Sequence, residues 1–156
     1  MKIRLLSIGH SMPDWVNRGY TEYARRLCGP VQLELLELDN IPRSKNTNLQ
    51  TLLAKEYDTL QAARVKGDFL VVLDVQGSMI STEGLATQLE NWQAQHRCIS
   101  LVIGGPDGID NRLKQQAAWR WSLSPLTFPH PLVRIIVAEQ LYRAFSILQH
   151  HPYHRQ

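Results

Sequence analysis

The stretch Asp68-Phe69-Leu70-Val71-Val72-Leu73-Asp74-Val75 decides the fold class of this 156-residue chain. Its middle is apolar without interruption, and residues 99–103 form a second run that is almost wholly apolar. Short runs of this kind are typical of parallel strands that helices cover on both faces. The two runs therefore predict central strands of a parallel sheet.

Weaker patterns on either side of these runs complete an alternating order of strands and helices. Strands are expected at 2–9, 31–38, 68–75, 98–104 and 119–123. Helices are expected from Pro13 to about Leu27, over 49–66, from Ser81 to about Gln95, over 110–118, and from Pro131 to about Gln149. This alternation predicts an α/β/α sandwich in a single domain that spans residues 1–156.

The composition is that of an ordinary globular protein. Hydrophobic residues make up 44% and charged residues 20% of the chain, which is too apolar for a disordered one. No apolar run approaches the roughly 18 residues of a membrane span, and residues 1–9 fit a strand better than a signal peptide. Cys28 and Cys98 lie too far apart for a redox or metal motif. We therefore expect a cytoplasmic protein with reduced thiols.

The net charge of +3 says little, but the basic residues are clustered. They gather at 18–26, at 43–45 and along the C-terminal stretch with Arg134, Arg143 and Arg155. Such patches could meet phosphates, although solvated helix faces explain the first two clusters equally well. The tail histidines His150, His151 and His154 have no cysteine near them, so we expect a polar tail and no metal.

The last helix is apolar around most of its circumference. Only a narrow polar stripe through Glu139, Arg143 and Ser146 interrupts it. A helix of this kind must be buried on more than one side. We predict a homodimer that covers it; the alternative is a helix buried deeply within one chain.

Three loops follow the carboxyl ends of expected strands, where open α/β sheets bind ligands: 73–78, 103–108 and 123–131. The pair Gly104-Gly105 lets the backbone approach a nucleoside cofactor, although a tight structural turn explains it better when it is taken alone. The loop 123–131 mixes apolar residues with hydroxyls, which suits an adenine ring; an ordinary strand–helix connection is the alternative. Neither G-x-G-x-x-G nor G-x-x-x-x-G-K-[ST] occurs, which disfavours classical dinucleotide and P-loop enzymes.

Several ordered motifs, spread over essentially the whole chain, resemble the SPOUT methyltransferases. They are Gly9-His10-Ser11-Met12-Pro13-Asp14-Trp15-Val16, Tyr20-Thr21-Glu22-Tyr23, Ile103-Gly104-Gly105-Pro106-Asp107-Gly108, the stretch from Trp121 to Arg134, Glu139-Gln140-Leu141-Tyr142-Arg143-Ala144, and Pro152-Tyr153-His154-Arg155. The resemblance implies a C-terminal trefoil knot, a rare exception to unthreaded chains. It also implies a homodimer that holds S-adenosylmethionine in the knot.

The resemblance also implies particular site residues and a substrate. The expected cofactor-binding residues are Leu73, Gly104, Gly105, Leu123, Ser124, Pro125, Leu126, Thr127 and Phe128. The branch of the family that the chain resembles most N3-methylates a pseudouridine in 23S rRNA, and the expected partner is the assembled ribosome.

Methylation at N3 requires removal of a proton, because this imide nitrogen is mostly protonated at neutral pH. The candidate catalytic residues, all in the C-terminal motifs, are His130, Arg143, Tyr153, His154 and Arg155. The histidine could transfer a proton, an arginine could stabilise the imide anion or grip a phosphate, and Tyr153 could stack on the base. The resemblance suggests that the tail closes over a site formed with a partner subunit.

Two other functions remain as alternatives. The first is an RNA-binding protein without activity on the same scaffold, against which the intact cofactor loops argue. The second is a nucleotide-dependent oxidoreductase, which the missing fingerprint disfavours.

Overall fold

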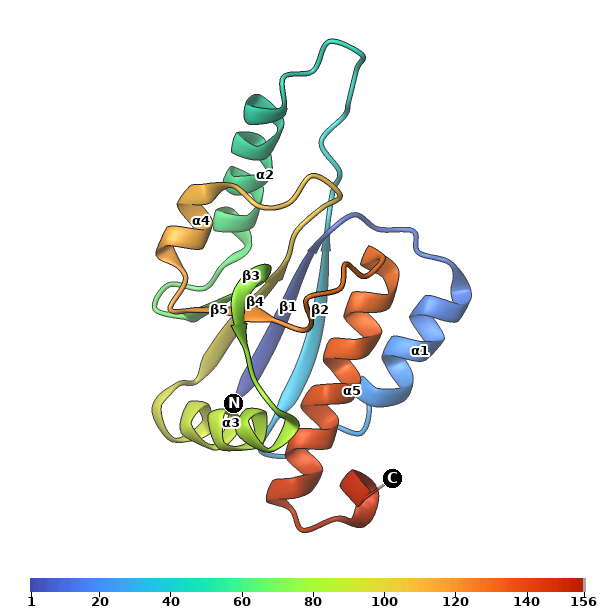
Figure 1. The fold of residues 1–156 in the computed structure, drawn as a ribbon, viewed down its shortest axis with the longest axis vertical. Helices are drawn as coiled ribbons and strands as arrows, with labels where there is room; N and C mark the ends of the chain where they lie inside the picture. Colours follow the sequence, from blue (N-terminus) through green and yellow to red (C-terminus); the bar gives the residue numbers. More distant parts are fainter. Residues whose placement is uncertain (156) are drawn as a thin grey trace.

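A computed structural model describes residues 1–155, and a five-stranded sheet forms its centre (Figure 1). The strands are β1 (Lys2–Ile8), β2 (Gln32–Leu38), β3 (Phe69–Met79), β4 (Cys98–Ile103) and β5 (Trp119–Ser122). They lie in the order β2-β1-β4-β3-β5, and every neighbouring pair is parallel. The predicted parallel sheet is confirmed.

Helices cover both faces of this sheet. They are α1 (Asp14–Ala24), α2 (Leu49–Ala63), α3 (Thr82–Gln95), α4 (Asn111–Gln116) and α5 (His130–Leu148), and a short 3-10 helix η1 (Pro152–Arg155) follows. Helices α1, α3 and α5 share one apolar core with the sheet, and α2 and α4 share the other. The expected α/β/α arrangement is confirmed, whereas the trefoil threading stays a prediction.

The apolar runs are explained by the two cores. In β1, Ile3 and Leu5 lie in the core under α1, α3 and α5, whereas Leu6 and Ile8 lie in the core under α2 and α4. Successive side chains of a strand point to opposite faces, so a strand that is covered on both sides needs apolar residues at successive positions.

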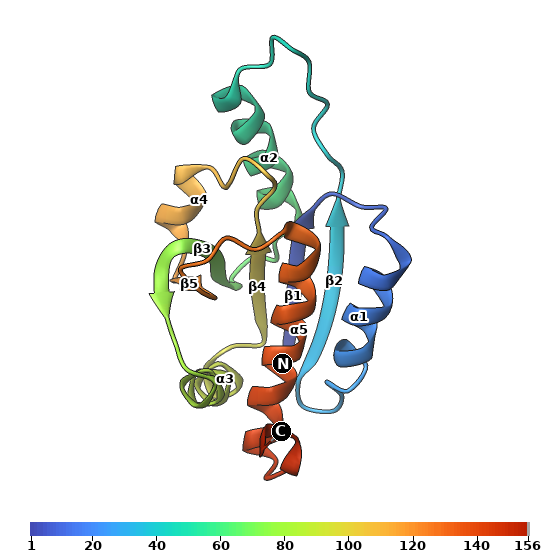
Figure 2. The same cartoon turned by 45° about the vertical axis from the view of Figure 1, so that its right-hand side comes forward.

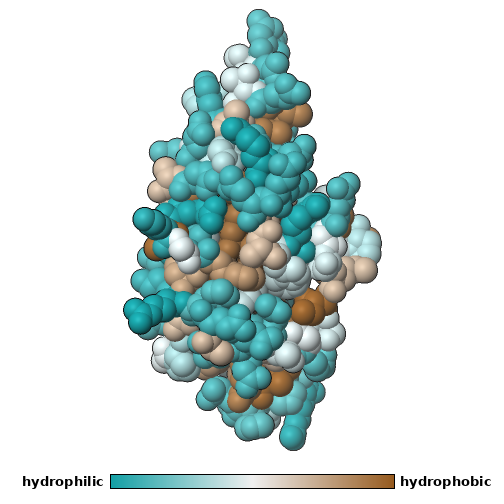
Figure 3. All heavy atoms as spheres, turned by 90° about the vertical axis from the view of Figure 1, so that its left-hand side faces the viewer, coloured by the Kyte–Doolittle hydropathy of each residue, from teal (hydrophilic) through white to brown (hydrophobic). Residues whose placement is uncertain are grey.

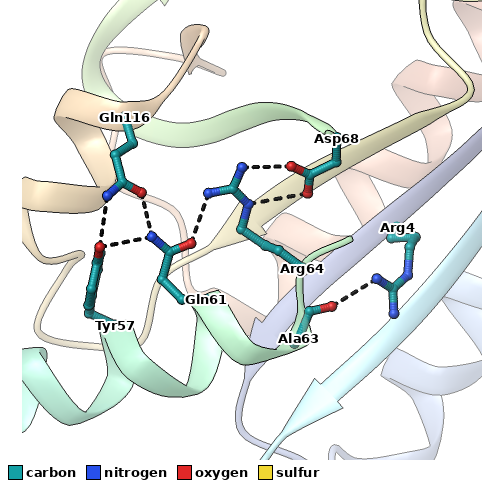
Figure 4. Close-up of polar contacts among 7 residues, drawn as sticks. All are labelled: Arg4, Tyr57, Gln61, Ala63, Arg64, Asp68 and Gln116. Carbon is teal, nitrogen blue, oxygen red and sulfur yellow. Dashed lines mark hydrogen bonds and ion pairs between the residues drawn. The ribbon is translucent and has the colours of Figure 1, made fainter. Parts of the chain in front are cut away.

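Polar contacts hold α2 and α4 together on their face of the sheet. The hydroxyl of Tyr57 in α2 accepts hydrogen bonds from the amides of Gln61 (2.8 Å) and of Gln116 in α4 (2.7 Å), as Figure 4 shows. At the end of α2, Arg4 of β1 donates to the carbonyl of Ala63 at 2.8 Å. These bonds position α4 relative to the strands.

The third strand is longer than predicted and is interrupted. Leu73 and Ser78 of β3 both lie opposite Trp121 of β5, so residues 74–77 bulge out between them. Such bulges re-aim side chains beside functional sites. A Cβ atom on Gly77 would lie 2.5 Å from the carbonyl oxygen of Arg120, so only glycine allows this close approach. The expected loop after residue 73 is therefore this bulge within a strand.

Helix α5 is covered largely by its own chain. It lies on the sheet between α1 and α3 and runs opposite to the strands (Figure 2). Deep burial within one chain thus explains why the helix is apolar around most of its circumference. Ser146, which we expected on the polar stripe, is buried as well. Leu132, 38% exposed, remains uncovered. Within residues 1–155, no helix has the length and apolarity that a membrane span requires.

The bulge gives a test of the fold. We expect Gly77→Ala to lower the free energy of unfolding by roughly 2 kcal/mol, because the new methyl group must push β3 away from β5. The matched control is Gly84→Ala, whose Cβ would lie 2.6 Å from Cγ1 of Ile80, an atom of a side chain that can move, and not against backbone as at Gly77. Urea denaturation measures both variants, and equal stability of the two would contradict the account of the bulge.

Candidate active site

A cavity of about 300 Å³ lies at the carboxyl ends of β3, β4 and β5. These strands are neighbours in the sheet, so the segments that follow them meet at one edge. The bulge of β3, the glycine loop after β4, the loop after β5 and the first turn of α5 form its walls. The lining residues are Leu73, Asp74, Val75, Ile103, Gly104, Gly105, Pro106, Gly108, Ile109, Lys114, Trp121, Leu123, Ser124, Leu126, Thr127, Phe128, His130 and Val133.

The cavity brings together nearly all of the residues that the sequence suggested for the cofactor. Of the nine, only Pro125 does not line it. The Oγ of Ser124 accepts a hydrogen bond from the backbone N–H of Leu126 at 3.0 Å, which turns the loop so that Pro125 and Leu126 are exposed. On the side of the molecule where α4 lies, apolar atoms gather in patches at mid-height within a largely hydrophilic surface (Figure 3).

The glycine loop is both a tight turn and a cavity wall. Gly108 has a φ of +90°, which favours glycine. A Cβ on Gly104 would collide with Ile109 and approach the Gly108 carbonyl oxygen to 2.9 Å. The structural and the functional interpretations of this motif are therefore compatible. The tight turn places backbone without side chains at the wall of the cavity.

His130 begins α5 and is held by a buried polar chain. Its Nε2 lies 3.1 Å from the Oγ of Ser7, which accepts a hydrogen bond from Arg134 at 3.1 Å. Arg134 in turn pairs with the carboxylate of Glu37 at 3.1 Å. Burial lowers the pKa of the His130 imidazole, and the charge of Arg134 lowers it further, whereas backbone hydrogen bonds oppose the shift. The ring is therefore neutral at pH 7.

Arg134 corrects an expectation from the sequence. Its side chain is completely buried, so it cannot belong to a basic surface that meets phosphates. The other expected basic clusters are largely paired within the chain: Arg18 with Asp14, Arg25 and Arg26 with Glu22, and Arg43 with Asp107.

The predicted tail residues form a second cluster at the far end of α5. Glu139 accepts hydrogen bonds from Arg143 Nε at 2.8 Å and from the Tyr153 hydroxyl at 3.2 Å. The guanidinium of Arg143 lies 4.9 Å from the centre of the Tyr153 ring. Burial, followed by the charge of Glu139, raises the pKa of Tyr153 to about 12, so the phenol keeps its proton. His154 contacts the carbonyl of His151 at 2.7 Å, and Arg155 is exposed.

Within one chain these two groups of predicted residues stay apart. His130 and Arg143 are separated along α5 by about 20 Å, given the helical rise of 1.5 Å per residue. Figure 2 shows the tail beyond the opposite end of α5 from the loops that line the cavity. One chain thus supplies the cavity and His130 at one edge of the sheet and the tail cluster at the other.

Two charged residues of the cavity were missed as site residues. Asp74 follows the apolar run directly, and that position could have suggested a role. Lys114 lies on α4, and nothing in its local sequence links it to the strand ends. In the described part of the chain, no group of His, Cys, Asp and Glu side chains is arranged to hold a metal ion.

The parallel sheet and the cavity at its carboxyl edge define an α/β protein with a ligand-sized cavity where open sheets of this class bind ligands. Two solved structures share this fold: a probable methylase family protein from Haemophilus influenzae Rd KW20 and a tRNA (m1G37) methyltransferase from Aquifex aeolicus. The first has a TM-score of 0.51 at 19% identity, over 97% of this chain and 69% of that one. The second has a TM-score of 0.51 at 15% identity, over 92% and 70%.

The sequence comparisons define the family. The family model described as "Predicted SPOUT methyltransferase" matches residues 1–154. The ribosomal RNA large subunit methyltransferase H of Marinomonas sp. (strain MWYL1) is 46% identical over 155 residues, which are 99% of this chain and 100% of that protein. The chain therefore belongs to the SPOUT methyltransferases, enzymes that use S-adenosylmethionine, and the resemblance seen in its motifs is confirmed.

The buried histidine predicts a pH dependence of stability. Its pKa is lower in the folded chain than the ordinary 6.5. Below pH 6.5 the unfolded chain therefore binds a proton that the folded chain does not, and stability falls as the pH is lowered. We expect the wild type to lose more stability between pH 7 and 5 than His130→Asn, in urea denaturation at each pH. Equal losses of unfolding free energy in the two proteins would show that His130 does not cause the pH dependence.

Proposed function

We propose that this enzyme methylates N3 of a pseudouridine in 23S rRNA, on the assembled ribosome in the cytoplasm. The full-length match to a protein named as a ribosomal RNA large subunit methyltransferase H supports the rRNA substrate. The resemblance of the C-terminal motifs supports the choice of the pseudouridine nitrogen. The fold comparisons do not bear on this choice, because one of the two similar structures is a tRNA methyltransferase.

The observation that carries the proposal is the cavity at the carboxyl edge of the sheet. Its walls are mostly apolar, with backbone from the glycine loop and the hydroxyls of Ser124 and Thr127 among them. Apolar walls with a few polar groups fit an adenosyl group, and about 300 Å³ is at the lower end of ligand-pocket volumes. We propose that Leu73, Gly104, Gly105 and residues 123–128 hold S-adenosylmethionine there.

The cofactor supplies an electrophilic methyl group on a sulfonium. The chain's own residues bind and orient the donor and the base, and stabilise the charge that develops. Loops that line a partly enclosed cavity fix the donor so that the base nitrogen can approach in line. The Nε2 of His130 can accept the N3 proton only where Ser7 does not donate its own hydroxyl proton to that nitrogen. Tyr153 keeps its proton, so stacking on the base is the role we propose for it. Arg143 and Arg155 supply positive charge for the imide anion.

We propose that a second copy of the chain completes the site. The predicted catalytic residues of one chain lie at opposite ends of α5, so a shared site requires the tail of one subunit to reach the cavity of another. A symmetric dimer meets this requirement twice, because each surface is used by both subunits. The exposed Leu132 in the first turn of α5 offers apolar surface near the cavity for such a contact.

Methyl transfer to ribosomes tests the activity. Ribosomes from a strain that lacks the gene are incubated with the protein and radiolabelled S-adenosylmethionine, and the labelled nucleotide is mapped. We expect label on N3 of one pseudouridine of 23S rRNA. Absence of label on ribosomes, subunits and free rRNA, with folded protein, would refute the substrate; calorimetric binding of the cofactor would still distinguish another methyltransferase from an RNA-binding protein.

Mixed dimers test the shared site. Ser124→Trp blocks the cavity and Tyr153→Ala removes the tail ring, and we expect each variant alone to be nearly inactive. Random mixing makes half of the dimers hybrid, and each hybrid has one intact site of two, so about a quarter of wild-type activity should return. Hybrid dimers that are demonstrably present but inactive would place the whole site within one chain.

A further inference from the structure

A cluster of three charges lies at one wall of the cavity. The Asp74 side chain is only 7% exposed and accepts hydrogen bonds from Arg120 Nε at 3.0 Å and Nη2 at 2.5 Å. Its other oxygen accepts the backbone N–H of Gln76 at 3.1 Å. Burial alone would raise the pKa of Asp74, but these bonds and the nearby cations hold it below its ordinary value. Asp74 is therefore an anion whose oxygens are already engaged.

Lys114 is the second cation on this carboxylate. Its Nζ lies 3.4 Å from Asp74 Oδ2, an oxygen that Arg120 already contacts at shorter distance. Two cations and one anion leave this cluster with a net charge of +1. An ammonium group has three N–H donors, and a single long ion pair engages only part of them. The cluster thus has an excess of positive charge toward an anionic partner.

The position of Lys114 restricts what that partner can be. It is the only lysine or arginine among the described residues that line the cavity. Its side chain is 24% exposed, so it belongs to the cavity wall more than to an open surface where an RNA backbone would bind. The opposing walls are apolar and suit the adenosyl group. The anion that pairs with Lys114 should therefore belong to the small molecule whose adenosyl group fills the cavity.

We propose that Lys114 binds the carboxylate at the amino-acid end of S-adenosylmethionine, with Asp74 and Arg120 as the residues that position it. This inference rests on the proposed cofactor cavity. S-adenosylmethionine carries one carboxylate, at the opposite end from its adenine. A cation at one wall and apolar surface elsewhere therefore define which way the donor lies. Charge-assisted bonds in a partly buried site are strong enough to give that orientation.

Titration calorimetry with two ligands tests this proposal without any turnover. S-adenosylhomocysteine retains the amino-acid end, whereas 5′-methylthioadenosine has the same adenosine and thioether but lacks that end. We expect Lys114→Gln to weaken the binding of S-adenosylhomocysteine about tenfold or more, because a bond between charged groups is lost. Binding of 5′-methylthioadenosine should change less than about twofold, because it makes no bond to an ammonium. That ligand also reports that the variant is folded.

Matched controls complete the experiment. Lys66→Gln makes the same change at an exposed lysine outside the cavity and should alter neither affinity. Lys114→Arg keeps the positive charge and should therefore retain most of the affinity for S-adenosylhomocysteine that Lys114→Gln loses. An equal loss for both ligands, or no loss for either, would overturn the proposal, as would a loss confined to rRNA binding. A wild-type protein that binds neither ligand would instead refute the cofactor cavity itself.

Discussion

The buried guanidinium of Arg134 is the interaction on which the geometry of the site depends. A charge without access to water must have its partners supplied by the protein. Those partners are Ser7 and Glu37, which lie near the carboxyl ends of two neighbouring strands, β1 and β2. This requirement anchors the first turns of α5 above that edge of the sheet. The loop after β5 ends at α5, so the same contact also fixes where the third wall of the cavity lies.

The direction of α5 then separates the two halves of the predicted chemistry. A helix that starts at the carboxyl edge and runs back along the sheet must end near the amino edge, and the tail follows it there (Figure 1). At that end, Arg26 lies within 6 Å of the rings of Tyr142 and Tyr153, which are themselves 4.7 Å apart. The tail is thus packed against α5 and against the segment that follows α1, and it forms an ordered surface. An ordered surface remote from its own cavity is suited to meet the cavity of another copy.

Much of the fold could be predicted from the sequence, because it follows from local patterns. The apolar runs at 69–73 and 99–103 are short and nearly uninterrupted, which is the pattern of strands buried on both faces, and the rule that ligands bind at strand ends points to the loops after them. Three features could not be predicted. The bulge at 74–77 depends on pairing with β5. The burial of Arg134 depends on partners 97 and 127 residues away in the chain, and an arginine on a helix is usually solvated. Lys114 reaches the cavity only because α4 packs beside β3.

The titratable groups of the cavity bear on the reaction itself. Among the described lining residues they are Asp74, Lys114 and His130. Asp74 is a poor proton acceptor, because its oxygens hold Arg120, Lys114 and a backbone N–H. Burial lowers the pKa of the His130 imidazole, which makes it a weaker base than a free histidine, and its Nε2 already lies against Ser7. The cavity of one chain is therefore equipped to bind and orient a donor more than to deprotonate a base. In the proposed dimer, the tail of the second subunit is the part of the protein that would bring further groups to the N3 proton, which links the proposed assembly to the chemistry.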